Sequence, residues 1–298
     1  MSEDGTRAGV LAAVTVSLIW GLSFVAASIV LKTLSPVTLA TLRFILASVL
    51  FTPIIVSNAL KGALPSGADL KEMALLGFLS ISLYFWLQYT GVKYAGAGVS
   101  ALLVVGFIPI LTGIASSIIL KEAMGRGRVL GAATGFLGVA MVTLPKLTGV
   151  HVDTGFLFGV VCLLGNAVCW SLYSTLSRRL MQRTGRPAFV TSYVTLFGAL
   201  FLVPLSLTSD WGSLGALTVN QWVSVLYLAV VCSGGGYLLW NFALSRLESF
   251  RAAVWLYLEP VAAFLGEVVI LGTVPDAVTA AGGTLVLLGA LVTSVSRK

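Results

Sequence analysis

Long apolar blocks follow one another along almost the whole of this 298-residue chain. Crossing about 30 Å of hydrocarbon takes about 20 helical residues, and each block comes close to that length. The blocks are continuous, whereas barrel strands alternate between apolar and polar positions, so the pattern predicts membrane-spanning helices. The ten predicted spans are residues 8–31, 37–57, 72–92, 97–120, 127–145, 155–177, 187–208, 219–244, 249–271 and 276–295.

The chain aligns with itself when it is shifted by about 150 residues, which indicates an internal repeat. With this shift Trp20 falls on Trp170, and several prolines and glycines stay in register. Each half holds five predicted helices, an odd number, so the second half must enter the membrane from the opposite side. We therefore predict an all-α integral membrane protein of ten transmembrane helices, built as two inverted five-helix repeats, residues 1–148 and 149–298. Such repeats are typical of carriers.

Composition and charge agree with this class. Of the residues, 58% are hydrophobic and 10% are charged, against about 25% charged in soluble domains. The net charge of +7 could suggest a nucleic-acid partner, but the basic residues are unevenly distributed. With the N-terminus inside, fourteen of the eighteen lysines and arginines lie in inner segments, three lie outside, and Arg43 lies within a span. This positive-inside bias predicts that both termini are cytoplasmic, and it explains the charge without nucleic acid.

Four segments carry a resemblance to a known family. They are SLIWGLSFVAAS (17–28), LSPVTLATLRFILAS (34–48), GFIPILTGIASSIILKEAM (106–124) and WLYLEPVAAFLGEVVILG (255–272). On these segments the chain resembles the drug/metabolite transporter superfamily, in its ten-helix EamA-type branch. Within that branch it is most similar to the YddG-type exporters of aromatic and other neutral amino acids.

The resemblance implies a multi-pass carrier in the bacterial inner membrane that exports small amphipathic metabolites by alternating access, with aromatic and neutral amino acids as the leading substrates. Sister branches move nucleobases, sugars or cysteine-pathway compounds, so these stay as alternatives. The resemblance also implies a cavity walled by helices 1, 3, 4, 6, 8 and 9, with helices 5 and 10 standing aside. A small-molecule substrate and the lipid bilayer are the expected partners. We expect a monomer, with a homodimer as the alternative.

Polar and aromatic residues recur at three- and four-residue spacing in the third and sixth spans, and therefore share one face of each helix. Amides, hydroxyls and aromatic rings on one face are typical of a solute pocket. The alternative is that they bond neighbouring helices or anchor the chain at the membrane interface. The predicted substrate-binding residues are Trp20, Ser80, Tyr84, Gln88, Asn166, Trp170, Tyr173, Trp255 and Glu259.

Two carboxylates, those of Glu259 and Glu267, lie inside the ninth span. An acid at the membrane centre costs at least about 2.5–3.5 kcal/mol, and usually marks a pair, a water-lined cavity or a proton path. No mid-membrane cation is visible for Glu259, so we expect a neutral acid or one that faces water. Each acid is a candidate for proton coupling, for contact with a substrate amine, or for a bond between helices. Arg43 is expected to extend toward the membrane interface as an anchor, with solute binding as the alternative.

Two kinds of residue predict bending inside the membrane. A proline removes an intrahelical hydrogen bond and tends to kink the helix, which leaves the carbonyl four residues back free to face a cavity. Consecutive glycines lower helix stability by about 1 kcal/mol each relative to alanine, which favours a hinge or a close helix approach. The candidate gating or hinge residues are Pro109, Gly234, Gly235, Gly236 and Pro260.

No catalytic machinery is visible in the sequence. There is no G-x-x-x-x-G-K-[ST] loop, so ATP hydrolysis would need a partner. The three cysteines lie inside predicted spans and lack metal-ligand spacing. We expect no cofactor, no metal and no enzyme activity, and the alternative classes are a channel and an intramembrane enzyme.

Overall fold

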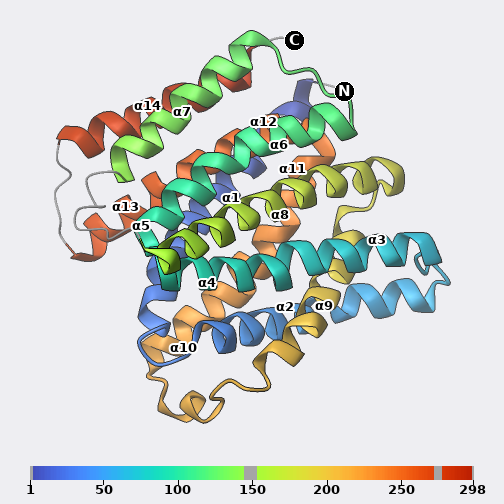
Figure 1. The fold of residues 1–298 in the computed structure, drawn as a ribbon. Coiled ribbons are helices and arrows are strands. Elements are labelled where there is room, and N and C mark those ends of the chain that lie inside the picture. The colour runs from blue at the N-terminus through green and yellow to red at the C-terminus, as the bar shows by residue number, and fades with distance from the viewer. Residues whose placement is uncertain (1–2, 144–152, 272–276, 297–298) are drawn as a thin grey trace.

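The computed structural model describes residues 3–143, 153–271 and 277–296, and within these ranges every regular element is a helix (Figure 1). Labels beginning with η mark π- or 3₁₀-helices. The elements in chain order are α1 (Glu3–Val30), α2 (Pro36–Leu60), α3 (Gly67–Gly77), η1 (Phe78–Leu83), α4 (Tyr84–Ala95), α5 (Ala97–Ser100), η2 (Ala101–Val105), α6 (Gly106–Ile119), α7 (Arg126–Thr143), α8 (Thr154–Thr184), α9 (Pro187–Ser206), η4 (Gly212–Ala216), α10 (Val219–Leu226), η5 (Tyr227–Gly236), α11 (Tyr237–Arg246), α12 (Ser249–Ala253), η6 (Val254–Tyr257), α13 (Leu258–Leu271) and α14 (Ala277–Val295).

Seven helical stretches of the described residues are long and apolar enough to cross a membrane. They correspond to the first four and the sixth to eighth predicted spans. Their bounds are Glu3–Val30, Pro36–Leu60, Gly67–Ala95, Ala101–Ile119, Thr154–Thr184, Pro187–Ser206 and Val219–Arg246. The prediction of an all-helical membrane protein is therefore confirmed.

Local capping signals explain where several helices begin and end. The Ser35 hydroxyl accepts a hydrogen bond from the backbone N–H three residues on, and Pro36 takes the first position of α2, where a missing N–H costs nothing. Thr218 and Gln221 form a reciprocal capping box at the start of α10. Helix α8 ends at Gly185, whose φ of 64° is the left-handed conformation that favours glycine.

Three π-helical segments, η1, η2 and η5, interrupt the long helices, and the sequence pattern does not predict them. A π-turn changes the regular i→i+4 pairing, so backbone carbonyls become available to other donors. The glycine run lies at the end of η5. A Cβ on Gly236 would lie 2.5 Å from Nε1 of Trp20, so close approach requires this glycine. Gly234 and Gly235 have no such neighbour nearer than 3.5 Å.

Helices α7 and α14 lie side by side and pack through facing glycines (Figure 1). A Cβ on Gly289 would lie 2.4 Å from the amide nitrogen of Gly135 and 2.5 Å from the carbonyl oxygen of Gly131. A Cβ on Gly138 would lie 2.6 Å from the carbonyl oxygen of Gly282. Only glycine permits this backbone contact, which is the way small residues join helices where lipid provides no hydrophobic driving force.

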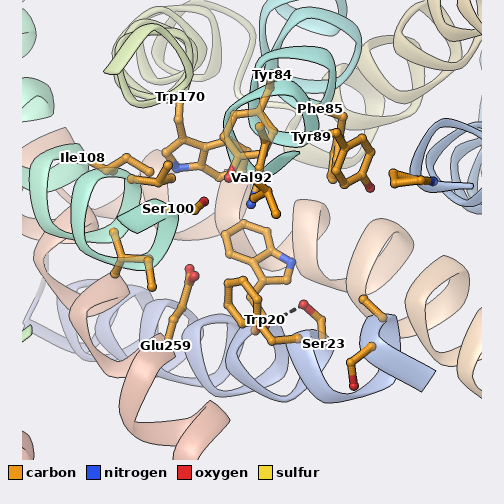
Figure 2. Close-up of a pocket in the computed structure, with 18 of the residues that line it drawn as sticks. Trp20, Ser23, Tyr84, Phe85, Tyr89, Val92, Ser100, Ile108, Trp170 and Glu259 are labelled. Atoms are coloured by element: carbon orange, nitrogen blue, oxygen red, sulfur yellow. Dashed lines mark hydrogen bonds between the residues drawn. The ribbon is translucent and has the colours of Figure 1, made fainter. Parts of the chain in front are cut away.

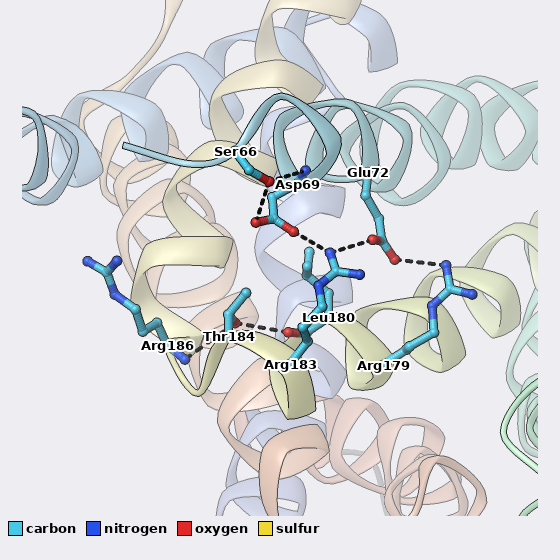
Figure 3. A network of polar contacts seen from close by, with 8 residues as sticks. All are labelled: Ser66, Asp69, Glu72, Arg179, Leu180, Arg183, Thr184 and Arg186. Carbon is cyan, nitrogen blue, oxygen red and sulfur yellow. Dashed lines mark hydrogen bonds and ion pairs between the residues drawn. The ribbon is translucent and has the colours of Figure 1, made fainter. Parts of the chain in front are cut away.

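An ion-pair network joins the start of α3 to the end of α8 (Figure 3). Glu72 accepts from Arg179 at 3.0 Å and from Arg183 at 2.9 Å, and Arg183 also pairs with Asp69. The Ser66 hydroxyl caps α3 and donates to the Asp69 carboxylate at 2.8 Å. Because both arginine side chains are half exposed, solvent and salt screen these pairs, and their contribution is mainly to orient the two helix ends.

Replacing Gly289 with alanine should destabilise the α7–α14 contact. The added methyl group overlaps backbone atoms of α7, and overpacking of this kind costs about 1–3 kcal/mol. The expected result is a lower melting temperature of the purified protein in detergent.

Gly283→Ala is the matched control on the same helix. The nearest atom to its added Cβ, on Val261, lies 3.9 Å away. Alanine also raises helix stability by up to about 1 kcal/mol, so this variant should keep or raise the melting temperature. An equal loss in both variants would contradict the packing account.

Candidate functional site

A cavity of about 470 Å³ lies among the helices near the middle of the fold (Figure 2). This volume is in the range of pockets for small organic molecules, about 300–1,000 Å³. Its walls come from α1, α2, α4, α5, η2, α6, α8, α11, η6 and α13, and no described residue of α7 or α14 lines it. The residues predicted for substrate binding that line it are Trp20, Tyr84, Gln88, Trp170 and Glu259.

The cavity extends toward one end of the bundle. There its lining includes Leu31, Pro36 and Lys93, which lie at the connections between α1 and α2 and at the end of α4. Leu31 and Lys93 are exposed. We call this end the mouth, and the opposite end of the same helices the closed end.

Aromatic rings form most of the inner wall. Trp20 and Trp170 meet edge to face, with ring centroids 5.2 Å apart, and Tyr84 lies 5.2 Å from Trp170. Tyr237 lies 5.7 Å from Trp170 and completes the cluster. Edge-to-face pairs are a favourable arrangement for aromatic rings, so the rings stabilise one another and the wall presents both ring faces and edges.

Two of these rings are hydrogen-bonded to backbone carbonyls of the π-helices. Trp20 Nε1 donates to the carbonyl of Cys232 in η5 at 3.0 Å. The Tyr237 hydroxyl donates to the carbonyl of Ser80 in η1 at 2.9 Å. Each ring is thus tied by its polar atom to a neighbouring helix of the bundle.

Four predicted site residues lie behind the wall and do not line the cavity. Asn166 donates to the Tyr84 carbonyl at 2.7 Å, and the Tyr173 hydroxyl donates to Asn241 at 3.1 Å. Ser80 is fully buried, with its hydroxyl bonded to its own helix, and Trp255 is buried in η6. Asn166 reaches the cavity lining through its bond to the backbone of Tyr84. Ser80 does so through its own carbonyl, which accepts from the Tyr237 hydroxyl.

Glu259 lies at the cavity edge, where its side chain extends toward Ser100 and the Trp20 ring (Figure 2). The backbone of α13 packs tightly on α1 here, since a Cβ on Gly21 would lie 2.5 Å from the Glu259 carbonyl oxygen. Within the described part of the chain, the Glu259 carboxylate takes part in no ion pair or hydrogen bond. The carboxylate is thus available to water or to a polar solute in the cavity. The side chain of Glu267 lies outside the described residues.

Arg43 was expected to extend to the membrane interface, and this expectation is wrong. Its side chain is buried, with 7% exposure, and lines the cavity. Its Nε donates to the Ser233 hydroxyl at 2.8 Å, and its guanidinium carbon lies 5.3 Å from the ring centroids of Phe44 and Phe85. The partner serine is 190 positions away in sequence, so nothing local in the chain reveals this burial.

The two prolines of the repeat lie beside irregular turns that border the cavity. Pro109 in α6 follows the π-helix η2, and Pro260 in α13 follows the 3₁₀-helix η6. Neither proline can donate to the residue four positions back, which is Val105 or Leu256. Both of these residues line the cavity.

Buried polar contacts join the helices at the closed end. Arg178 of α8 donates to Glu122 at 2.5 Å, to the Leu244 carbonyl at 2.7 Å and to the Leu247 carbonyl. Glu122 in turn accepts from the Ser249 backbone N–H at 2.9 Å. The ends of α6, α8, α11 and α12 are thereby held together. We call these residues the Arg178–Glu122 cluster.

Two further contacts reinforce this closure. Arg128 of α7 pairs with Glu248, next to the start of α12. The Asn241 side chain of α11 accepts from Ser177 at 2.7 Å and donates to Thr191 of α9 at 2.8 Å. No cluster of three or more histidine, cysteine or acidic side chains with metal-binding geometry occurs among the described residues.

Comparison with known proteins gives consistent results. The model of the EamA-like transporter family matches residues 7–144 and again residues 157–295. An uncharacterized transporter of Archaeoglobus fulgidus is 31% identical over 280 residues, which cover 94% of this chain and 96% of the relative. A probable amino-acid metabolite efflux pump of Salmonella typhimurium is 28% identical over 287 residues, which cover 93% of this chain and 91% of the relative.

A crystal structure of another protein is similar over 99% of this chain and 98% of that chain, with a TM-score of 0.80 and 21% identity. That likeness concerns the fold. The two matches to one family model cover most of the chain, and the described helices include seven of membrane-crossing length. The chain is a multi-pass integral membrane protein and belongs to the EamA-like transporter family.

Proposed function

We propose that this chain is a secondary-active or facilitative carrier that exports small amphipathic metabolites, in particular aromatic and other neutral amino acids, by alternating access. The observation that carries the proposal is the cavity, in which Trp20, Tyr84 and Trp170 stand beside the polar groups of Gln88 and Glu259. Aromatic rings offer contact area to an apolar side chain, and a few polar groups orient the rest of the solute. The relative described as a probable amino-acid metabolite efflux pump supports this substrate class.

The proposed architecture is ten transmembrane helices in two inverted five-helix repeats, residues 1–148 and 149–298, with both termini cytoplasmic. In support, the family model matches twice, once in each half. Irregular turns precede both Pro109 and Pro260, and the glycine-rich helices α7 and α14, the last of each half, pack on each other. With this orientation the mouth faces outward and the Arg178–Glu122 cluster faces the cytoplasm.

Alternating access requires that the closed end opens when the mouth closes. The Arg178–Glu122 cluster is the proposed cytoplasmic gate, because it joins four helices through one buried cation. Pro109 and Pro260 remain the proposed kink sites and Gly234–Gly236 the proposed hinge. Within that run, Gly236 has a packing role against Trp20, so hinge motion is assigned to Gly234 and Gly235, where an added Cβ would make only ordinary van der Waals contacts, at 3.5 and 3.7 Å.

Purified protein in liposomes should exchange radiolabelled L-phenylalanine for unlabelled amino acid inside, with influx accelerated by the internal substrate. A carrier that alternates between two states shows this trans-stimulation, and a channel does not. Tyr84→Leu keeps apolar bulk but removes a ring from the wall, and should raise KM for phenylalanine about three- to tenfold.

Trp222→Leu is the control, since Trp222 is exposed and lies outside the cavity lining. Exchange of nucleobases or sugars without exchange of any amino acid would refute the proposed substrate class. Flux without trans-stimulation would refute the carrier mechanism.

Glu122→Gln should favour opening of the cytoplasmic gate. The change leaves the buried Arg178 guanidinium without its charged partner, which costs the closed state about 1–3 kcal/mol, or about five- to 150-fold in population. Spin labels at the exposed positions Lys121→Cys and Arg246→Cys, with the three buried native cysteines replaced, should report longer distances.

Glu3→Gln provides the comparison, because the Glu3–Arg7 pair is exposed and such pairs contribute little. Unchanged distances in Glu122→Gln would argue against a gate at this cluster.

Proton coupling is a second proposed role of Glu259, favoured by its place in the cavity without an ion-pair partner among the described residues. If Glu259 carries the coupled proton, Glu259→Gln should remove the pH dependence of transport while substrate exchange continues. Glu267→Gln is tested in the same way. Retained pH dependence in both variants would exclude coupling through these acids.

A further inference from the structure

We propose that Arg43 binds the carboxylate group of the transported solute, so that the cavity selects amino acids with a free carboxylate. This inference rests on the proposed amino-acid transport and deepens it by assigning one pole of the substrate to one residue. It concerns a side chain whose sequence position favoured an interfacial anchor over contact with the solute.

The guanidinium of Arg43 is buried with few partners. Arg43 is only 7% exposed, yet its only hydrogen bond among the described residues is from Nε to Ser233 at 2.8 Å. No described carboxylate pairs with it. Removing a cation from water is costly unless an anion or several acceptors compensate. The terminal amino groups of Arg43 therefore require an acceptor, and the cavity that the residue lines is where one can come from.

The contacts of Arg43 leave the terminal nitrogens of its guanidinium without a partner among the described residues. The Ser233 bond uses Nε, and the Phe44 and Phe85 rings support the guanidinium carbon at 5.3 Å through cation–π contact, which uses no donor. The two terminal nitrogens stay available as a pair. Such a pair matches the two oxygens of a carboxylate, and this bidentate bond is stronger than one between neutral groups.

Arg43 lies next to the aromatic wall of the cavity. Its guanidinium contacts the Phe85 ring, whose centroid lies 5.1 Å from that of Tyr84. The Tyr84 centroid in turn lies 5.2 Å from that of Trp170. A carboxylate held by Arg43 would leave the apolar side chain of the same solute against these rings. An amino acid with an aromatic side chain has both parts within one small molecule.

Lys93 is the other cation among the described residues that line the cavity, and it differs from Arg43 in its exposure to solvent. It is exposed at the mouth, over the Tyr94 ring at 5.3 Å, so water already solvates its charge. Only the buried cation needs a partner from the solute. The carboxylate site is therefore assigned to Arg43.

The test is competition in proteoliposomes that exchange L-phenylalanine. L-phenylalaninamide keeps the ring and the amine but lacks the carboxylate. With the wild-type protein, it should therefore inhibit exchange of labelled L-phenylalanine at least about tenfold more weakly than unlabelled L-phenylalanine does. Arg43→Gln should raise KM for L-phenylalanine about ten- to a hundredfold, and the two compounds should then inhibit exchange almost equally. Arg43→Lys keeps the charge but loses the bidentate fork, so its KM and its preference should lie between those of the wild type and of Arg43→Gln.

Two variants separate binding from folding. Ser233→Ala removes the only described hydrogen bond of Arg43, so it reports any effect that is merely structural, and it should keep the preference for the free carboxylate. Arg186→Gln removes a cation that lies 4.0 Å from the Phe189 ring, away from the cavity, and should match the wild type.

Three outcomes would overturn the assignment. Equal competition by the amide in the wild-type protein, an unchanged KM in Arg43→Gln, or a loss of preference in Ser233→Ala equal to that in Arg43→Gln would each refute it, and amino-acid transport would still stand. If the wild-type protein exchanged no amino acid at all, the proposed function and this inference would both fail.

Discussion

The cost of taking charges and unpaired backbone groups out of water is the constraint on which this structure depends. At the closed end the protein meets that cost itself, because Arg178 bonds Glu122 and two backbone carbonyls. In the cavity it does not, since Arg43 and Glu259 have no ion-pair partner among the described residues. Those two groups need water or a polar solute. The same constraint thus explains both why one end is closed and why the centre is hollow.

The backbone follows the same rule. The Tyr237 hydroxyl and the Trp20 indole, which would be costly if buried unpaired, donate to backbone carbonyls of the π-helices η1 and η5. Gly236 leaves Trp20 the room that this contact needs.

Helical class and membrane location could be predicted because the length of an apolar run reports directly on the thickness of hydrocarbon. Helical spacing also identified the faces that carry Tyr84 and Trp170. Spacing cannot tell a face that borders a cavity from one that meets a neighbouring helix. It therefore predicted Tyr173 and Asn166 as cavity residues, although they bond neighbouring helices behind the lining. That distinction depends on how helices cross. Arg43 was misjudged for a similar reason, since its partner Ser233 is supplied by a distant π-helix.

The proposed function requires that the cavity lined by Tyr84 and Trp170 binds a small amino acid. Isothermal titration of L-phenylalanine into the purified protein in detergent tests it most directly. The account predicts saturable binding at one site per chain, lost when Tyr84 and Trp170 are both replaced by alanine in a protein that stays folded. No saturable binding of any neutral amino acid, or binding unaffected by that double replacement, would contradict it.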